Sequence, residues 1–155
     1  MTPTRPYAVS AVANYILQHS HGSVTNLKLQ KMLYYMQGFF LGKFGTPLFD
    51  EDLVAWKYGP VIPGLYSALS HNRDNPITET LSAPYSIEDA EDRQFLDSAI
   101  ATLEPYDAIY LLRKSHMPGS PWSTIWQNGA GYRHVIPKEL IRSYFAESMS
   151  RTVDK

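Results

Sequence analysis

The sequence predicts a mainly α-helical protein, a single compact domain over residues 1–155 with about six to seven helices. Three observations predict this fold class. Apolar residues recur at three- and four-residue spacing in several segments, which is the period of one helix face. Serine, threonine, proline and glycine stand where these segments begin or end, while strand-like patterns are confined to short runs. The length is typical of one domain, and a hydrophobic content of 44% is enough to build a core.

Two N-terminal segments carry the clearest helical patterns. The segment 7–20 has an apolar stripe at helical spacing, which predicts a first helix. In the segment 25–45, Thr25 or Asn26 can cap the start of a helix, and Gly45 stands where that helix should end. Apolar residues cover most of the circumference of this second helix. It is therefore expected to be buried on several sides and to form the centre of the core.

A small β element is expected at most, around residues 53–58 and 77–81. The first of these runs could equally be a distorted turn of helix, because short apolar runs do not distinguish strand from helix. Gly59–Pro60 interrupts whatever structure precedes it, and Pro63 suits the first turn of a further helix.

The second half of the chain contains several further helical segments, each with a start signal. Ser86 is expected to cap one helix, Pro105 to begin the next, Ser120 to cap a short third one and Pro137 to open the last. The end of the chain is polar, and residues 150–155 are expected to fray. No internal repeat and no linker divides the sequence.

The composition argues against several classes of protein. The chain contains no cysteine, so it has no disulfide, no cysteine-based metal site and no thiol nucleophile, which suits a reducing cytoplasm. No apolar run approaches the roughly 18 residues of a membrane span, and the N-terminus lacks the pattern of a signal peptide. We therefore expect a cytoplasmic protein without a membrane partner. A net charge of −1 is low for a general nucleic-acid binder, so direct nucleic-acid binding is not expected.

The charges are distributed unevenly along the chain. Residues 1–49 contain no Asp or Glu, residues 74–107 are strongly acidic, and the chain after 107 is basic again. Such asymmetry can steer a charged partner toward the protein. The alternative is that oppositely charged segments attract each other within the fold.

The sequence carries no recognisable catalytic motif. It has no glycine-rich phosphate loop, no zinc-protease helix motif and no serine-nucleophile elbow. His116 could act as a base, although capping of a helix end explains it as well. The acidic residues 50–52 lack the alternate spacing of a calcium loop. Lys28 and Lys31 could touch phosphate, but a solvated helix edge is the favoured interpretation. We therefore expect no enzyme activity, no metal and no cofactor.

Residues 56–66, WKYGPVIPGLY, combine three aromatic residues with two prolines around a Gly-Pro turn. The prolines fix φ and the glycine permits a conformation that other residues resist, which predicts a rigid corner. Trp56 is expected to pack on the central helix, whereas Lys57 or Tyr58 would face outward. For aromatic residues in general, core packing is the default, and exposed ones would be anchors of a protein interface.

A set of short motifs recurs here in a specific order. Leu-Lys-Leu-Gln-Lys lies on the central helix, followed by Gly-x-Pro-Leu-Phe, Ala-Trp-x-x-Gly-Pro-Val and a tyrosine, and later by a histidine, Ser-Pro-Trp and a helix after Ile-Pro. This set resembles the Panacea antitoxin domain, also called the SocA-like antitoxin family, over about residues 8–145. The motif residues, as scaffold or partner-binding groups, are Leu29, Gln30, Lys31, Trp56, Tyr58, Gly59, Pro60, Val61, Tyr66, His116 and Trp122.

The resemblance implies a non-enzymatic antitoxin of a bacterial or prophage toxin–antitoxin system. Such a protein neutralises a cognate toxin, encoded nearby, by direct protein binding. Three alternatives stay open: an adaptor that delivers the toxin to a host protease, a phage-encoded regulatory interaction protein, and a hydrolase built around His116. A shared scaffold cannot by itself discriminate between toxins, so contacts are expected on variable, outward-facing groups. The candidate toxin contacts are Lys57, Tyr58, Asp89, Glu91 and Asp92.

Overall fold

Seven α-helices and one two-stranded antiparallel sheet make up most of residues 3–153, the part of the chain that the computed structural model describes. The predicted fold class is therefore confirmed. In chain order the elements are α1 (Val9–His19), α2 (Asn26–Phe44), β1 (Val54–Trp56), β2 (Gly59–Val61), α3 (Pro63–Leu69), α4 (Ala90–Leu103), α5 (Ala108–Ser115), α6 (Pro121–Trp126) and α7 (Lys138–Val153), with short 3₁₀ turns at Ser70–Asn72 and Gln127–Gly129.

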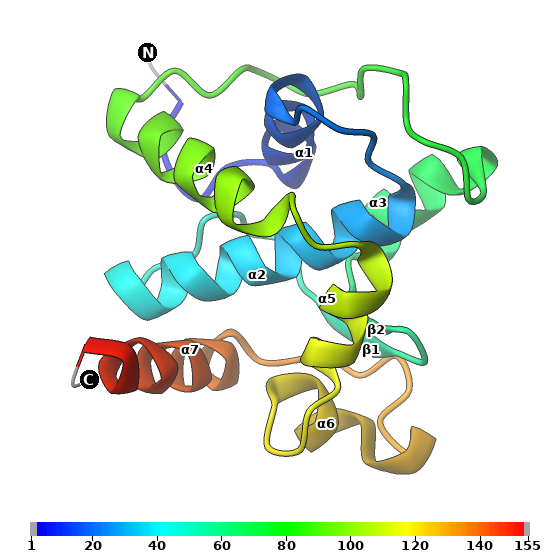
Figure 1. Cartoon of the computed structure of the whole chain (residues 1–155), viewed down its shortest axis with the longest axis vertical. Helices are drawn as coiled ribbons and strands as arrows, with labels where there is room; N and C mark the ends of the chain where they lie inside the picture. The colour runs from blue at the N-terminus through cyan, green and yellow to red at the C-terminus, as the bar shows by residue number, and fades with distance from the viewer. Residues whose placement is uncertain (1–2, 154–155) are drawn as a thin grey trace.

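Helix α2 is the centre of the fold, as predicted. It passes between α1 and α4 on one side and α7 on the other, with α5 and the hairpin near its N-terminal half (Figure 1). The Thr25 side chain caps its start by accepting a hydrogen bond from the backbone N–H of Lys28, 3.2 Å away. Gly45 ends it in the left-handed conformation at φ 79°, which glycine adopts without a steric penalty.

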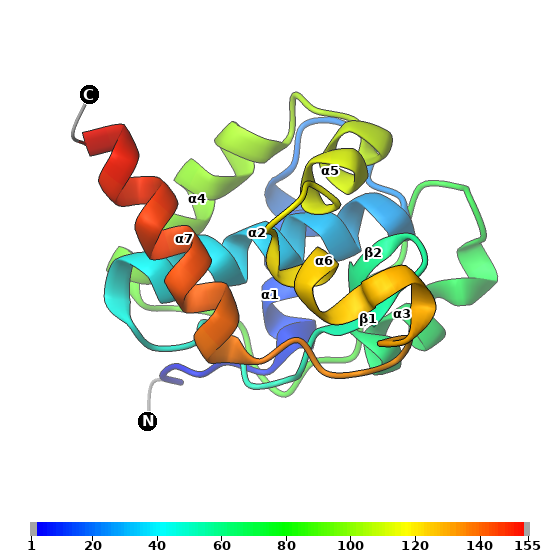
Figure 2. The ribbon, with the colours of Figure 1, turned by 90° about the horizontal axis from the view of Figure 1, so that it is seen from below.

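Helix α7 packs closely against α2, and two glycines of α2 make this possible. A methyl group at Gly38 would overlap the ring of Phe145, and one at Gly42 would lie only 3.0 Å from the backbone nitrogen of Ala146. The two helices therefore approach each other where α2 has no side chains. Figure 2 shows α7 crossing over α2.

The sheet is a hairpin of β1 and β2, paired in the register Val54↔Val61 and Trp56↔Gly59. The expectation of a strand at 53–58 is thus confirmed, but the second expected strand, at 77–81, is absent. The backbone N–H of Ile77 bonds to the carbonyl of Val24, so it meets a loop instead of a strand.

A side chain takes the place of a partner strand at the other end of this segment. The amide group of Asn14 accepts a hydrogen bond from the Leu81 N–H at 2.8 Å and donates one to the Leu81 carbonyl at 2.9 Å. One amide side chain satisfies both backbone groups of Leu81, so this segment does not join a sheet.

Two helices begin later than their sequence signals indicated. Helix α4 is capped by Asp89, not by Ser86: its carboxylate accepts a hydrogen bond from the backbone N–H of Asp92. Helix α5 is capped by Asp107, not opened by Pro105. In both places an aspartate just downstream offers a stronger acceptor to the free N–H groups of the first turn.

The remaining start signals agree with the structure. Ser120 caps α6 through its hydroxyl, and Pro63 occupies the first turn of α3. Pro137 directly precedes α7, which continues to Val153 and so includes most of the tail expected to fray; residues 154–155 lie outside the described part. No helix in the described part of the chain is long and apolar enough to cross a membrane.

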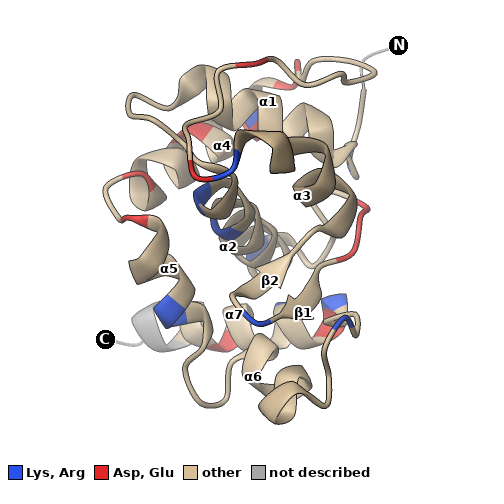
Figure 3. Cartoon of the chain, turned by 90° about the vertical axis from the view of Figure 1, so that its right-hand side faces the viewer, with Lys and Arg blue, Asp and Glu red and all other residues tan. Residues whose placement is uncertain are grey.

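Charged segments that are far apart in the sequence meet in the fold, as the second of the two interpretations proposed. Arg5 forms an ion pair with Asp92 at 3.2 Å, and Lys138 forms one with Asp52 at 2.9 Å. The Lys28 ammonium donates to the Glu104 carbonyl at 2.7 Å. Figure 3 shows acidic residues on α4 and on the turn toward α5, and basic residues on α2 and at the end of α5.

Candidate functional site

Two polar motif residues of α2 hold the Gly-Pro corner in place. The side-chain oxygen of Gln30 accepts a hydrogen bond from the backbone N–H of Ile62 at 2.9 Å. One residue on, the Lys31 ammonium donates to the carbonyl of Pro60 at 3.0 Å. Both side chains are fully buried, and so are the neighbouring Leu29 and Val61. These residues therefore fix the hairpin to the central helix.

Lys31 does not lie on a solvated helix edge, and that expectation was wrong. Its side chain is 0% exposed, and burial lowers the pKa of its ammonium group to about 7. Gly59 explains how the side chain fits. A Cβ atom at Gly59 would lie 3.0 Å from Lys31 Cε and 3.0 Å from Ser115 Oγ, so only glycine leaves room for the lysine beneath the hairpin.

Another buried amide, Gln37, holds backbone groups about two turns further along α2. Its oxygen accepts hydrogen bonds from the backbone N–H groups of Leu48 and Phe49, at 2.8 and 3.3 Å, and its nitrogen donates to the Phe49 carbonyl at 2.8 Å. The sequence analysis did not single out this residue. A glutamine among the apolar residues of this helix is the signal that could have found it, because a buried amide needs partners.

Trp56 lies half-buried at the start of the corner. Its ring packs edge-to-face against Tyr66 of α3, with ring centroids 5.0 Å apart. Its carbonyl oxygen accepts a 2.8 Å hydrogen bond from the indole N–H of Trp122, which ties α6 to the hairpin. The Tyr66 carbonyl in turn accepts from the side chain of Asn26. The motif residues thus form one network of packing and hydrogen bonds around the corner.

His116 belongs to this network through its ring. It follows the last residue of α5 and stacks flat on Trp122, with centroids 3.7 Å apart and planes 3° from parallel. Burial, and secondarily the charge of Lys31, lowers the pKa of the imidazole. Its Nε2 atom is buried without a hydrogen-bond partner among the described residues, as is Nε1 of Trp56.

The structure does not place His116 in a catalytic arrangement. The neighbouring Ser115 hydroxyl donates to the carbonyl of Leu112 at 2.6 Å and does not pair with the imidazole. Within residues 3–153, no group of three or more His, Asp or Glu side chains is placed to hold a metal ion.

The candidate toxin contacts fall into two separate groups. Lys57 and Tyr58 form the exposed turn of the hairpin, and the Tyr58 side chain is 60% exposed. Asp89 and Glu91 are exposed at the start of α4, at the opposite end of the molecule (Figures 1 and 2). Asp92 is buried, so it is not the outward-facing group that was expected. It pairs with Arg5 and accepts a hydrogen bond from the Tyr7 hydroxyl, so it ties the N-terminal segment to α4.

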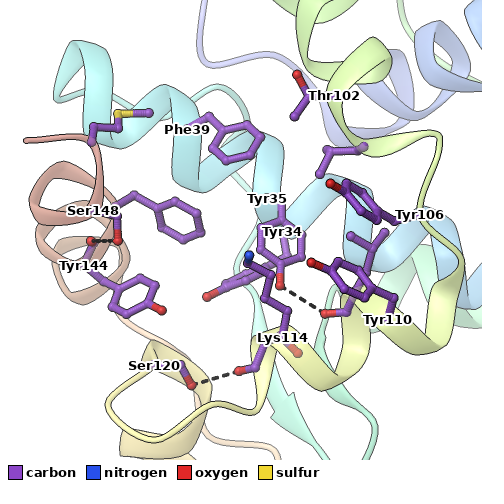
Figure 4. Close-up of a pocket in the computed structure, with 15 residues that line it drawn as sticks. Tyr34, Tyr35, Phe39, Thr102, Tyr106, Tyr110, Lys114, Ser120, Tyr144 and Ser148 are labelled. Carbon is purple, nitrogen blue, oxygen red and sulfur yellow. Dashed lines mark hydrogen bonds between the residues drawn. The ribbon is translucent and has the colours of Figure 1, made fainter. Parts of the chain in front are cut away.

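An aromatic groove of about 500 Å³ lies away from both groups, with α2 as its floor (Figure 4). The end of α4 and helix α5 form one wall, and α7 forms the other. Most of its lining is apolar or aromatic. The residues that line it are Tyr34, Tyr35, Phe39, Thr102, Leu103, Tyr106, Tyr110, Leu111, Lys114, Ser115, Ser120, Tyr144, Phe145, Ser148 and Met149.

Phe145 organises the wall that α7 contributes. Its ring meets those of Tyr34, Tyr35 and Phe39 edge-on, at centroid distances of 5.6, 6.1 and 5.8 Å. The Tyr35 hydroxyl donates to the Leu111 carbonyl at 3.0 Å and so links the floor to α5. Helices α5 and α7, which flank the groove, are thus both held against α2, so the packing of the fold itself forms the groove.

The opposite rim carries two exposed tyrosines and a lysine at four-residue intervals. Tyr106 and Tyr110 stack on each other with centroids 4.4 Å apart, although each is more than 40% exposed. Lys114 follows one turn later and places its ammonium 6.0 Å from the Tyr110 ring. Tyr106 lies in the turn before α5, whereas Tyr110 and Lys114 lie one turn apart on α5. Their regular four-residue spacing is the signal in the sequence that could have indicated the groove.

Comparison with known proteins places these features in a family. The family model for "Antitoxin SocA-like, Panacea domain" matches residues 29–123, from the middle of the Leu-Lys-Leu-Gln-Lys motif on α2 to the start of α6. This chain belongs to the SocA-like antitoxin family. The matched span contains every member of the corner network described above except Asn26, and α7 lies beyond it.

One curated relative extends the family match. This SocA-like chain is 34% identical over 134 residues to "Antitoxin SocA" of Caulobacter vibrioides (strain NA1000 / CB15N), covering 78% of this chain and 71% of the relative. No solved structure matches it. The buried corner network thus corresponds to the part that defines the SocA-like family, whereas the groove also uses α7.

Proposed function

We propose that this chain is the antitoxin of a toxin–antitoxin pair and neutralises its toxin by direct protein–protein binding. The proposal rests on the membership of this chain in the SocA-like antitoxin family, together with its 34% identity to Antitoxin SocA over most of both chains. The partner is a toxin protein whose gene lies next to the gene of this chain.

The structure supports binding in two ways. The polar motif residues Gln30 and Lys31 are buried and hold the hairpin rigidly, so they serve as scaffold for whatever surface meets the partner. Exposed aromatic side chains, above all Tyr106 and Tyr110, supply the kind of surface on which protein interfaces depend most for their affinity.

Co-expression with the neighbouring genes tests this proposal. Each open reading frame beside this gene is induced in a bacterial host, with and without the full chain. We expect one of them to arrest growth, the chain to restore growth, and the two proteins to co-elute as a stoichiometric complex in size-exclusion chromatography. Growth arrest that persists in the presence of the folded chain would contradict the proposal.

The lifetime of the toxin separates blocking from delivery to a protease, the principal alternative. Direct binding predicts that growth recovers while the half-life of the toxin stays the same or lengthens. A toxin half-life that shortens when the chain is present, and that recovers in a host lacking one of its proteases, would show adaptor action instead.

A further inference from the structure

The groove over α2 is large and apolar, and no described part of the chain covers it, so it is a candidate binding surface. We propose that it binds an amphipathic helix of the toxin, with an acidic side chain of that helix paired to Lys114. This inference rests on the proposed function and names the surface and the chemistry through which that function would act.

The exposed tyrosines give the first argument. Tyr106 and Tyr110 are 43% and 44% exposed, yet they stack on each other beside a floor of further aromatic rings. Large contiguous apolar surface of this kind is uncommon on a protein that acts alone, and it marks interaction sites. Apolar side chains that entered the groove would cover the outer faces of both rings and release the water held there.

The backbone around the groove gives the second argument, which concerns the shape of the partner. Floor and walls are built mainly from α2, the end of α4, α5 and α7, whose backbone groups are bonded within their own helices. The only sheet among residues 3–153 is the hairpin, and none of its residues lines the groove. A partner segment buried here finds no strand edge and must satisfy its own N–H and C=O groups, as a helix does.

The charge at the rim gives the third argument. Among the described residues that line the groove, Lys114 is the only one with a charged side chain, and Figure 4 shows its ammonium projecting over the groove between the two walls. None of the lining residues that the structure describes carries a carboxylate, and none of the ion pairs found between described residues involves Lys114. A partner aspartate or glutamate would complement this cation and fix the register of the bound helix.

Paired variants of α5 and of the turn before it test the groove. Tyr106→Ala/Tyr110→Ala removes the exposed stack, and Ile109→Ala is its control, because Ile109 is 50% exposed on the same helix as Tyr110 but outside the groove. Lys114→Glu reverses the charge at the rim of the groove. Its control is Arg113→Glu, which makes the same change of charge at the adjacent residue, outside the groove lining. The probe is the toxin identified by co-elution, and its affinity for each variant is measured by calorimetry.

We expect the double tyrosine variant and Lys114→Glu each to weaken toxin binding by about tenfold or more, and both controls to stay within about threefold of the wild type. Replacing the matching acidic residue of the toxin helix by lysine should restore the affinity of Lys114→Glu. If the toxin binds both groove variants as tightly as the wild type, the groove inference is overturned and the antitoxin function stands. A toxin that does not bind the wild-type chain overturns both.

Cysteine labelling gives an independent measurement. The chain has no cysteine, so Thr102→Cys places one thiol in the groove and Ser67→Cys places one on α3 as the control. Bound toxin should slow maleimide labelling of the first thiol and leave the second unchanged. Equal labelling of both in the complex would contradict the inference. So would a small molecule that co-purifies with the wild-type chain, is found by mass spectrometry and is released only on unfolding or by the groove variants.

Discussion

The side-chain nitrogen of Lys31 lies 3.0 Å from the carbonyl oxygen of Pro60, and this buried hydrogen bond joins the central helix to the Gly-Pro corner. None of the ion pairs between described residues supplies a carboxylate to Lys31. Because burial disfavours the charged form, the pKa of the ammonium group is lowered to about 7. The corner is therefore held by an amine that changes its charge near neutral pH.

This lowered pKa predicts a pH-dependent stability. In the unfolded chain the pKa of Lys31 returns to its ordinary value of 10.5, so between these two values the unfolded chain binds one more proton than the folded chain. The free energy of unfolding should therefore rise with pH across this window, by up to about 1.4 kcal/mol per pH unit, and the destabilising effect should be complete below the folded pKa.

Urea unfolding of the wild type and Lys31→Met, from about pH 7.5 to about pH 9.5, measures this effect. As the pH rises, the free energy of unfolding of the wild type should increase steadily relative to that of Lys31→Met. The buried tyrosines are common to both proteins and cancel in this difference. Parallel stability curves would show that Lys31 keeps an ordinary pKa in the folded state.

The contact between α2 and α7 predicts a large effect of a small substitution. Gly38→Ala would push a methyl group into the Phe145 ring, so we expect a loss of about 1–3 kcal/mol in unfolding free energy from overpacking. Gly64→Ala in α3 is the control, since a methyl group there would contact nothing and should be neutral or slightly stabilising. Equal melting temperatures for the two variants would contradict the close packing of the helices.

The buried amide of Gln37 predicts another stability effect. Gln37→Leu keeps the approximate size of the side chain but leaves the N–H groups of Leu48 and Phe49 and the Phe49 carbonyl without their side-chain partner, which should cost about 1–3 kcal/mol. Gln94→Leu, at an exposed position of α4, should change stability by less than about 0.5 kcal/mol. Denaturant titrations compare the two, and a Gln37→Leu variant as stable as the wild type would count against the hydrogen bonds.

Asp92 and Glu91 are neighbours with different roles. Asp92→Asn should lower stability by about 1–3 kcal/mol, because it removes a buried charge that pairs with Arg5 and Tyr7. Glu91→Gln at an exposed position should leave stability unchanged. Neither should alter affinity for the toxin by more than about threefold, since both lie far from the groove. A selective loss of toxin binding in Glu91→Gln would indicate that the toxin contacts the acidic segment 74–107 and not the groove.

Local features of the fold could be predicted because their causes are local. The cap at Thr25, the helix end at Gly45 and the cap at Ser120 each depend on a few adjacent residues. The same holds for α2, whose apolar residues leave no wide polar face. The predicted strand at 77–81 failed because a strand needs a partner, and here the side chain of Asn14 satisfied Leu81 instead.

Lys31 and the groove could not be predicted for a different reason. A lysine is rarely fully buried, so the sequence pattern predicted that Lys31 faces solvent. In the folded chain the missing side chain of Gly59 leaves room for Lys31, which is therefore buried. The groove brings together Tyr35, Tyr110 and Tyr144 from three helices, and which of their faces remain uncovered depends on how α5 and α7 dock. Their separate helical patterns all resemble ordinary core packing.

Titration of purified toxin with the purified full chain, without any protease present, tests the central claim most directly. We predict that toxin activity falls in proportion to the added chain and disappears at a fixed stoichiometric ratio, with the toxin recovered intact in the complex. Full toxin activity in the presence of excess folded chain would contradict neutralisation by direct binding.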